Sequence, residues 1–276
     1  MSGVAAFVAA VRVIHPAPAA TVVALSAVLG AILSAESGLD PGWRLALTTM
    51  AVAGSQILTG ALNDWADRDR DRVAQPSKPI PSGALSPAMA LGVAGVGMAL
   101  QLGASLPLGQ VPLLLGATAS ASAVAYNLWL SRTPLSVLPY LISFGILPLW
   151  IAAGVGVDLA RVAIAPLVVG PFAAAAHLAN TVRDFDGDAR LGSRNLAQTL
   201  GRATTFRLAW GLAMAVGLGL GAALLLGAGP VPPASVGLGL VGLVAVGQGV
   251  AGPQRLWIGM LVAAVCWTAA WALATA

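Results

Sequence analysis

Apolar stretches of about 20 residues recur along the 276-residue chain, and they constrain its fold more than any other feature. A helix of that length crosses the roughly 30 Å hydrocarbon core of a bilayer. Only 9% of the residues are charged, whereas soluble domains carry roughly 25%. So few charges cannot cover the surface of a water-soluble protein. The sequence therefore predicts an all-α, multi-pass protein that is integral to the cell membrane.

Breaks between the apolar runs, marked mostly by proline and glycine, predict where the helices end. We expect a polytopic bundle of about nine transmembrane helices that forms a single transmembrane domain over residues 1–276. The first apolar run is expected to stay in the protein as a membrane helix rather than act as a cleaved signal. The expected helices span residues 18–36, 43–63, 88–106, 109–130, 135–156, 160–182, 205–228, 234–251 and 255–274.

The distribution of basic residues supports this helix count and predicts the orientation. With a cytoplasmic N-terminus, 12 of the 14 Lys and Arg residues fall on the cytoplasmic side. An excess of this kind is typical of cytoplasmic loops. We therefore relate the basic character of the chain to topology and to membrane lipids, and we expect no nucleic-acid partner. Arg44 and Arg161 fall on the other side, and the twelve are Arg12, Arg68, Arg70, Arg72, Lys78, Arg132, Arg183, Arg190, Arg194, Arg202, Arg207 and Arg255.

Two segments between the expected helices, 63–87 and 183–203, stand apart because they hold most of the acidic residues. Seven of the ten acidic residues fall in two short runs there, and all seven are Asp. Both segments follow an even-numbered helix, so both are expected on the cytoplasmic side. The first run contains Asp64, Asp67, Asp69 and Asp71, and the second contains Asp184, Asp186 and Asp188.

The spacing within each run favours a shared helix face. If the first run continues the preceding helix, Asp64, Asp67 and Asp71 lie at positions i, i+3 and i+7 of one face, and Asp69 points elsewhere. In the second run, two Asp residues lie four positions apart on one face, with Asp186 on the other side. Like charges on one face repel each other, so such faces favour bound cations.

Mg²⁺ is held by a few carboxylates together with water and phosphate oxygens. Two opposed Asp faces, each with Mg²⁺, would clamp a diphosphate, and nearby Lys and Arg would neutralise its remaining charge. The competing interpretation treats the runs as intrahelical Asp–Arg pairs in ordinary polar loops. That interpretation explains either run alone better than it explains both runs on one side of the membrane.

The two runs resemble the two signatures of the UbiA superfamily of intramembrane prenyltransferases. Asn63-Asp64-x-x-Asp67-x-x-x-Asp71, followed by Pro76-x-Lys78-Pro79, is similar to the first signature, and Asp184-x-x-x-Asp188 with Gly192 is similar to the second. The resemblance implies Mg²⁺ as the cofactor and a prenyl diphosphate as the donor. It implies metal-binding and catalytic roles for Asp64, Asp67, Asp71, Asp184 and Asp188, and substrate-binding roles for Asn63, Lys78, Tyr126 and Arg132.

The chain departs from the family pattern at a few positions. The family often has Asn where Ala74 stands and Arg where Lys78 stands, and Lys lacks the bidentate fork of Arg. The family usually has Arg-Pro at the start of the first helix, where this chain has His15-Pro16. Arg12 lies nearby and is the remaining basic candidate for a diphosphate contact at the N-terminus.

A histidine in the sixth expected helix is a further candidate. His177 lies seven residues before Asp184, on the same helix face about two turns deeper, and Asn180 lies between them. Ionisable groups within membrane helices are functional candidates by default. His177 would orient an acceptor or take its proton, with Asn180 beside it. The competing interpretation is a core histidine that is hydrogen-bonded to a neighbouring helix.

Together with these residues, the family resemblance implies a Mg²⁺-dependent enzyme that transfers a prenyl group to a lipid-soluble acceptor, expected to be aromatic, and releases diphosphate at the cytoplasmic face. One alternative is a terpene cyclase or diphosphate lyase with the same Asp motifs, in which the double bonds of the prenyl chain trap the cation. Another is an ion-coupled transporter, which would need charged groups near the bilayer midplane. The Asp residues cluster instead at expected helix ends.

Overall fold

The computed structural model describes residues 3–226 and 230–275, and every regular element within them is a helix. The chain forms two compact units. The first comprises residues 1–131 and 146–163, and the second comprises residues 132–145 and 164–276. This division does not follow chain order, because a short segment from the middle of the chain is exchanged between the units. That the whole chain forms one functional domain stays a prediction.

The hydropathy and length of the helices confirm the expected class of polytopic membrane protein. Within the described residues, eight helices are long and apolar enough to span a bilayer. The expected helix over 160–182 corresponds to α7 (Pro166–Arg183), which is not among the eight. Its polar residues His177, Asn180 and Arg183 lower its mean hydropathy. The count of nine spans and the cytoplasmic N-terminus therefore stay predictions.

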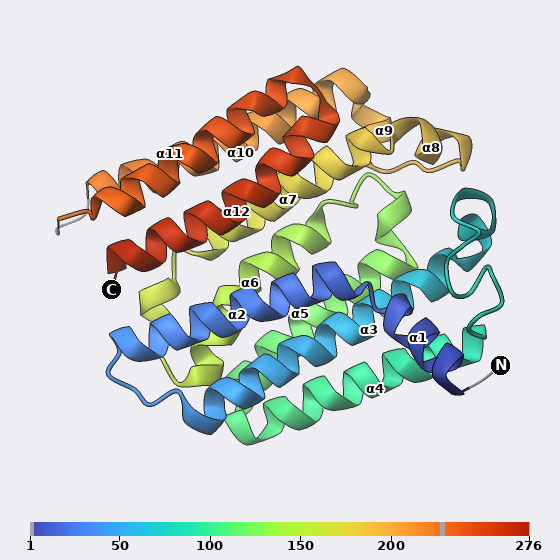
Figure 1. Cartoon of the computed structure of the whole chain (residues 1–276), viewed down its shortest axis with the longest axis horizontal. Coiled ribbons are helices and arrows are strands. Elements are labelled where there is room, and N and C mark those ends of the chain that lie inside the picture. Colours follow the sequence, from blue (N-terminus) through green and yellow to red (C-terminus); the bar gives the residue numbers. More distant parts are fainter. Residues whose placement is uncertain (1–2, 227–229, 276) are drawn as a thin grey trace. The chain divides into compact units, whose positions relative to one another are not determined.

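The first unit contains the helices that carry the first Asp run. Three of its helices run side by side, with α2 and α4 on either side of α3 (Figure 1), and α5 also packs on α3. The elements of this unit are α1 (Gly3–Val13), α2 (Pro16–Glu36), α3 (Gly42–Ala74), α4 (Pro87–Ser105), η1 (Leu106–Leu108), α5 (Gln110–Leu128) and η3 (Leu159–Val162).

Small residues set the close packing of α3 against α4. A Cβ atom added to Gly97 would lie 2.4 Å from the backbone nitrogen of Leu58. One added to Gly54 would lie 2.4 Å from the backbone nitrogen of Gln101. The backbones of the two helices therefore approach each other without intervening side chains, which is the usual packing mode of membrane helices.

Helix α6 (Leu138–Val155) belongs to both units, because the division falls between Gly145 and Ile146. Pro148 lies inside this helix, one turn after Phe144. Proline has no backbone N–H, so the hydrogen bond to the Phe144 carbonyl is missing and the helix is locally weakened. The short element η2 (Leu130–Arg132) similarly lies at the boundary, since residue 132 starts the second unit.

The second unit packs α7 against α10 and α12, and α11 against α12 (Figure 1). Its core contains small side chains such as Ala175, Ala209 and Ala263 around the larger Met260 and Trp267. The elements of this unit, after α7, are α8 (Phe185–Arg190), α9 (Leu196–Leu200), α10 (Arg202–Leu225), α11 (Pro233–Gly247), η4 (Gln248–Ala251) and α12 (Pro253–Thr275).

Several helix bounds differ from those expected. The sequence analysis assigned no helix before residue 18, but the structure has α1, an amphipathic helix too short to span a bilayer. The helix expected to end at residue 63 continues to Ala74, because no proline or glycine interrupts the Asp run. Residues 227 and 228 of the expected helix 205–228 lie outside the described residues.

The glycine packing gives a test of the α3–α4 interface. We expect Gly97→Ala to lower the thermal unfolding temperature of the detergent-solubilised protein, because overpacking costs about 1–3 kcal/mol. The matched control is Gly92→Ala in the same helix, where an added Cβ meets nothing within 4 Å. The control should leave the temperature equal or slightly higher, since alanine is the better helix former. Equal effects of the two substitutions would contradict the close contact.

Candidate active site

The first Asp run lies wholly within α3, which places Asp64, Asp67 and Asp71 on one face of a continuous helix. The side chains of Asp64 and Asp71 are only 1% and 7% exposed. Asp69 is 66% exposed, points away from this face and pairs with Arg72 at 3.0 Å. The run therefore combines a buried acidic face with an outward-facing residue, as the spacing predicted for a continuous helix.

A lysine bridges the two buried carboxylates. The Nζ atom of Lys78, in the segment between α3 and α4, lies 2.8 Å from Asp71 Oδ2 and 3.0 Å from Asp64 Oδ1. Burial lowers the pKa of Lys78, but the hydrogen bond to Asp71 and the charge of Asp64 outweigh it, so the pKa is raised above its usual value. Lys78 is therefore a permanent cation at neutral pH, and it compensates two buried negative charges.

The N-terminal helices supply two more basic groups. The Nε2 atom of His15, between α1 and α2, lies 2.9 Å from Asp64 Oδ1. Arg12, in α1, donates from Nη2 to the Ser77 carbonyl at 3.1 Å. Arg12 thus contacts the segment next to Lys78 rather than an Asp side chain. The second oxygen of Asp64, Oδ2, is buried and has no hydrogen-bond partner among the described residues.

A chain of amides connects the first run to α5. Asn63 Nδ2 donates to Asp67 Oδ2 at 3.5 Å and to Asn127 Oδ1 at 3.2 Å. Asn127 Nδ2 in turn donates to the Thr59 carbonyl at 2.9 Å. Asn127 is buried, and Tyr126 precedes it on α5 as a half-buried residue. The hydrogen bonds hold Asn63 and orient one oxygen of Asp67.

We name Asp64, Asp67, Asp71, Asn63 and Lys78 the first cluster. In the part of the chain that the structure describes, no three Asp, Glu, His or Cys side chains already converge as a metal site. Instead, the ammonium group of Lys78 lies between two of the carboxylates. The chemistry nevertheless fits Mg²⁺, because carboxylate oxygens are its preferred protein ligands and no described residue bonds to Oδ2 of Asp64.

The second Asp run lies at a junction between two helices. Helix α7 ends at Arg183, Asp184 caps it, and α8 starts at the next residue. The Asp188 backbone N–H donates to the Asp184 carbonyl at 3.0 Å, so helical spacing is kept across the junction. Asp184 is exposed, whereas Asp188 is half-buried. The second run is thus more open to solvent than the first.

The side chains of the second run have their own partners. Asp188 Oδ2 accepts a hydrogen bond from Asn195 Nδ2 at 2.9 Å, and Asn195 also caps α9. Asp186 forms an ion pair with Arg202, at the start of α10. Asp184 Oδ1 lies 3.4 Å from Nε of the adjacent Arg183. We name Asp184, Asp188 and Asn195 the second cluster, and Asp186 lies outside it, as its opposite-facing position predicted.

His177 is buried inside the second unit, with 4% of its surface exposed. Its ring stacks on that of Tyr140 at 4.2 Å between centroids. Its Nε2 atom lies 3.4 Å from Ser136 Oγ, which also accepts from the Leu196 backbone N–H at 3.4 Å. These contacts match the interpretation of a core histidine that is bonded to a neighbouring segment, and a role toward an acceptor stays a prediction.

Asn180 and Arg132 are the other predicted site residues of the second unit, and each accepts a backbone hydrogen bond from a residue of the segment 183–203. The Asn180 carbonyl accepts from the Asp184 backbone N–H at 3.1 Å, and its side chain is half-buried. Arg132 has an exposed side chain, and its carbonyl accepts from the Arg194 backbone N–H at 3.2 Å. Arg132 therefore belongs to the same unit as the second run, although it directly follows α5 in sequence.

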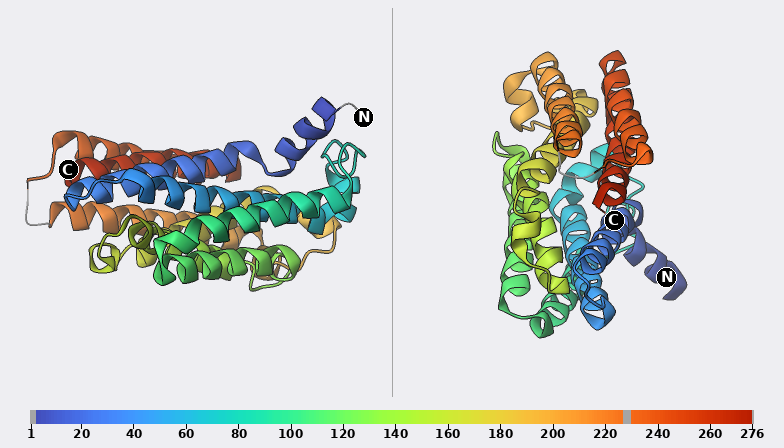
Figure 2. Two further views of the ribbon diagram at one scale, coloured as in Figure 1. Left: turned by 90° about the horizontal axis from the view of Figure 1, so that it is seen from below. Right: turned by 90° about the vertical axis from the view of Figure 1, so that its left-hand side faces the viewer.

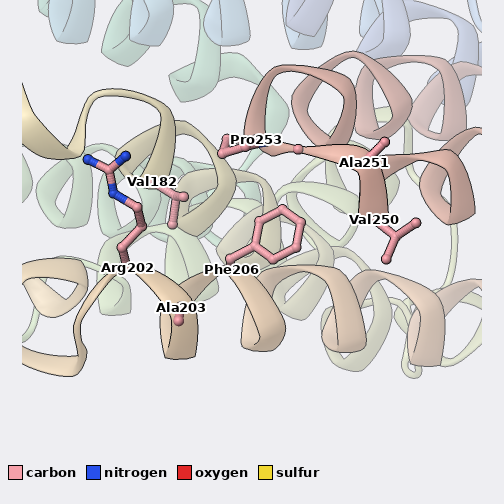
Figure 3. Close-up of a pocket in the computed structure, with 8 residues that line it drawn as sticks. Val182, Arg202, Ala203, Phe206, Val250, Ala251 and Pro253 are labelled. Atoms are coloured by element: carbon pink, nitrogen blue, oxygen red, sulfur yellow. The ribbon is translucent and has the colours of Figure 1, made fainter.

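A pocket of about 330 Å³ adjoins the second run. It lies between the end of α7, the start of α10 and the junction of η4 with α12, and its wall is apolar except for Arg202 (Figure 3). Arg202 is also the partner of Asp186, so the pocket opens beside the polar junction. None of the residues predicted from the sequence lines it; the lining residues are Val182, Arg202, Ala203, Phe206, Val250, Ala251, Gly252 and Pro253.

Three residues that contact the clusters were not predicted as site residues from the sequence: His15, Asn127 and Asn195. His15 was visible only as a departure from the family pattern. Asn127 would have been the easiest of the three to predict, because an amide side chain inside an apolar membrane helix needs a hydrogen-bond partner on another helix. Asn195 has the N-cap signature of Asn before a helix, but its contact with Asp188 depends on the fold.

The charge compensation in the first cluster gives a stability test. We expect Lys78→Met to destabilise the protein by roughly 3–5 kcal/mol, because it leaves two buried carboxylates without their cation. The matched control is Arg72→Met, which removes the exposed pair with Asp69 and should cost at most about 1 kcal/mol. Thermal unfolding in detergent without divalent metal measures both. A loss for Lys78→Met no larger than for the control would contradict the buried bridge.

Comparison with characterised proteins identifies the family of the chain. Residues 23–248 match the sequence model of the UbiA prenyltransferase family. The chain is 31% identical over 182 residues to digeranylgeranylglyceryl phosphate synthase of Natronomonas pharaonis, which covers 64% of this chain and 65% of that protein. It is also 31% identical to 4-hydroxybenzoate octaprenyltransferase of Cupriavidus metallidurans, over 77% of this chain and 73% of that protein.

The fold of this chain also matches that of a solved UbiA homologue. A UbiA homologue from Archaeoglobus fulgidus, in a structure bound to GPP and Mg²⁺, superimposes with a TM-score of 0.69 at 17% identity. The superposition covers 97% of this chain and 100% of the homologue. The family match spans most of the chain, and both Asp runs lie within it. This protein is a member of the UbiA prenyltransferase family.

Proposed function

We propose that this chain is a Mg²⁺-dependent intramembrane prenyltransferase, which moves a prenyl group from a prenyl diphosphate to a lipophilic acceptor and releases diphosphate. The observation that carries the proposal is the first cluster. Two buried carboxylates share one lysine, and a buried oxygen of Asp64 has no hydrogen-bond partner within residues 3–226 and 230–275. A purely structural ion pair needs no such surplus of negative charge, whereas a site for a divalent cation does.

The residues of the first cluster would act together on the diphosphate. Asp64, Asp67 and Asp71 would hold Mg²⁺, which neutralises diphosphate oxygens and stabilises the leaving group as negative charge develops. Lys78 carries its charge into the same cluster and would donate to a diphosphate oxygen that enters there. Asn63, fixed by Asn127, keeps one oxygen of Asp67 oriented. The orientation of Asp67 is therefore set before the substrate binds.

The second cluster would act in the same reaction. Its carboxylates, Asp184 and Asp188, also fit a hard cation, and the amide of Asn195 orients Asp188. The UbiA homologue from Archaeoglobus fulgidus, bound to GPP and Mg²⁺, supports a prenyl diphosphate and this metal as the ligands. We propose that the carboxylates of each cluster take part in holding Mg²⁺ and diphosphate, and that the active site opens to the cytoplasm.

The apolar helices would protect the reactive prenyl cation from water. The prenyl group leaves as an allylic cation when its carbon–oxygen bond breaks, and water would quench that cation. Helices that are almost free of charge keep water away from the prenyl chain. The cation then reacts with a nucleophilic carbon or oxygen of the acceptor, whose proton is lost. The names of the two relatives cover a glyceryl phosphate and a hydroxybenzoate, so both acceptor classes belong in the test.

Substitutions in the two runs test the catalytic assignment. We expect Asp67→Ala and Asp184→Asn each to reduce diphosphate release by roughly 100-fold or more, because each removes a proposed ligand of the Mg²⁺ that stabilises the leaving group. The matched controls are Asp69→Asn and Asp186→Asn, which alter the Asp residue of each run that lies outside its cluster. Enzyme-coupled detection of diphosphate from purified protein provides the measurement. Wild-type release by Asp67→Ala would refute the assignment.

A product screen tests the class of reaction. Purified protein receives prenyl diphosphates of several lengths with Mg²⁺, either alone or with 4-hydroxybenzoate or a prenylated glyceryl phosphate. We expect a prenylated acceptor by mass spectrometry, and its formation should stop with EDTA and return with excess Mg²⁺. A hydrocarbon or prenyl alcohol formed without acceptor would instead indicate a cyclase or lyase. No diphosphate release under any condition would overturn the proposal of an enzyme and favour the transporter alternative.

A further inference from the structure

One residue of the N-terminal region has an unusual backbone. Among the described residues, His15 is the only residue other than glycine with a positive φ, at φ 54° and ψ 66°. Left-handed backbone is unfavourable for a residue with a Cβ atom. The following residue is Pro16, which normally pushes its predecessor into an extended conformation. Two local preferences therefore oppose the conformation of His15, and surrounding contacts must hold it in place.

This conformation determines where α2 begins. Helix α1 ends at Val13, α2 begins at Pro16, and the chain bends sharply between them (Figure 2). The His15 carbonyl still accepts the first helical hydrogen bond of α2, from the Ala19 N–H at 3.1 Å. The bend directs the imidazole toward α3, where Nε2 lies 2.9 Å from Asp64 Oδ1. An extended backbone at His15 would point the ring in another direction.

The contact fixes one particular oxygen of Asp64. An ionised carboxylate only accepts hydrogen bonds, so the proton of this contact is on Nε2 of His15. Lys78 binds the same oxygen, Oδ1, at 3.0 Å. The other oxygen, Oδ2, is buried and lacks a partner among the described residues. Both donors therefore act on one side of the carboxylate and leave the other side available.

His15 and Lys78 differ in how firmly they orient Asp64. The long side chain of Lys78 is shared between Asp64 and Asp71. The short imidazole of His15 contacts Asp64 Oδ1 from Nε2 at 2.9 Å, and its side chain has fewer rotatable bonds than that of Lys78. Arg12 supports the arrangement indirectly, since it binds the carbonyl of Ser77 next to Lys78.

From this geometry we propose that His15 is a positioning residue that holds the rotamer of Asp64 and presents Oδ2 to the metal. The inference rests on the proposed function, because it assigns Asp64 to a Mg²⁺ site. It extends that function with a residue that neither Asp motif contains. His15 acts through Asp64, so it would change how tightly the metal is held. Hydrogen-bond partners of metal ligands typically change metal affinity by about 10–100-fold.

The test measures metal binding separately from catalysis. Binding of Mn²⁺ to the full-length protein in detergent, with inorganic diphosphate present, is followed by electron paramagnetic resonance of the free ion. His15→Leu removes the donor, and we expect Mn²⁺ to bind about 10–100-fold more weakly. His15→Gln keeps an N–H donor at a similar reach and should bind within about threefold of wild type. The Mg²⁺ concentration for half-maximal diphosphate release should shift in parallel.

A matched control and a stability measurement separate positioning from a structural role. Thr21→Ala, in the helix that follows His15, removes an exposed hydrogen bond to the Ala17 carbonyl and should leave Mn²⁺ binding and the unfolding temperature unchanged. Wild-type Mn²⁺ binding by His15→Leu would overturn the inference. If His15→Leu does not fold, His15→Gln decides: near-wild-type binding supports the inference, and weakened binding at an unchanged unfolding temperature overturns it.

The same measurements distinguish this inference from the proposed function. If wild-type protein binds Mn²⁺ and His15→Leu weakens the binding, His15 positions a metal ligand whether or not a prenyl diphosphate is consumed. If the wild type shows no Mg²⁺-dependent release of diphosphate from any donor, the proposed reaction fails on that result alone. If release depends on Mg²⁺ but is equally sensitive to Mg²⁺ in both His15 variants and the wild type, only the role of His15 fails.

Discussion

The compensation of buried carboxylates in the first unit is the interaction on which the candidate site depends. Asp64 is almost fully buried, and taking a carboxylate out of water is costly unless cations and hydrogen bonds replace the water. Lys78 and His15 provide this compensation from segments on either side of α3 in sequence. The loop after α3 and the bend before α2 are therefore held against the same helix face. Oδ2 of Asp64 has no hydrogen-bond partner among the described residues, so the protein compensates this buried carboxylate only in part.

Both clusters bring carboxylates together, but they do so with different arrangements of helices. The first uses one long helix, so the spacing of its Asp residues alone sets their common face. The second lies at the junction of α7 and α8, where the shorter helix and the cap of α9 position Asp188 through Asn195. A buried cluster and a more exposed one follow from this difference. Both depend on amide side chains, Asn63 with Asn127 in one and Asn195 in the other.

Much of the fold was predictable because lipid permits few alternatives. Backbone groups in hydrocarbon must be satisfied within the helix, so long apolar runs predict spans almost without reference to neighbours. That reasoning predicted nine spans, and eight described helices are long and apolar enough to be spans, but it did not predict α1, which is too short for one. It also placed a helix start at residue 160, where the chain forms η3 and reaches α7 only at Pro166. The family resemblance came from the two Asp runs, and the match over residues 23–248 confirms it.

The sequence by itself determined the membrane class, the helical spacing of Asp64, Asp67 and Asp71 and the family, because each depends on local composition or on residues close together in the chain. The tertiary structure decided which groups compensate those charges. His15 lies 49 residues before Asp64, and Asn127 lies 64 residues after Asn63. No periodicity links positions so far apart, since their contact depends on helix packing and on a backbone conformation at His15 that local preferences oppose. The exchange of residues 132–145 and 146–163 between the two units is likewise a property of the folded chain alone.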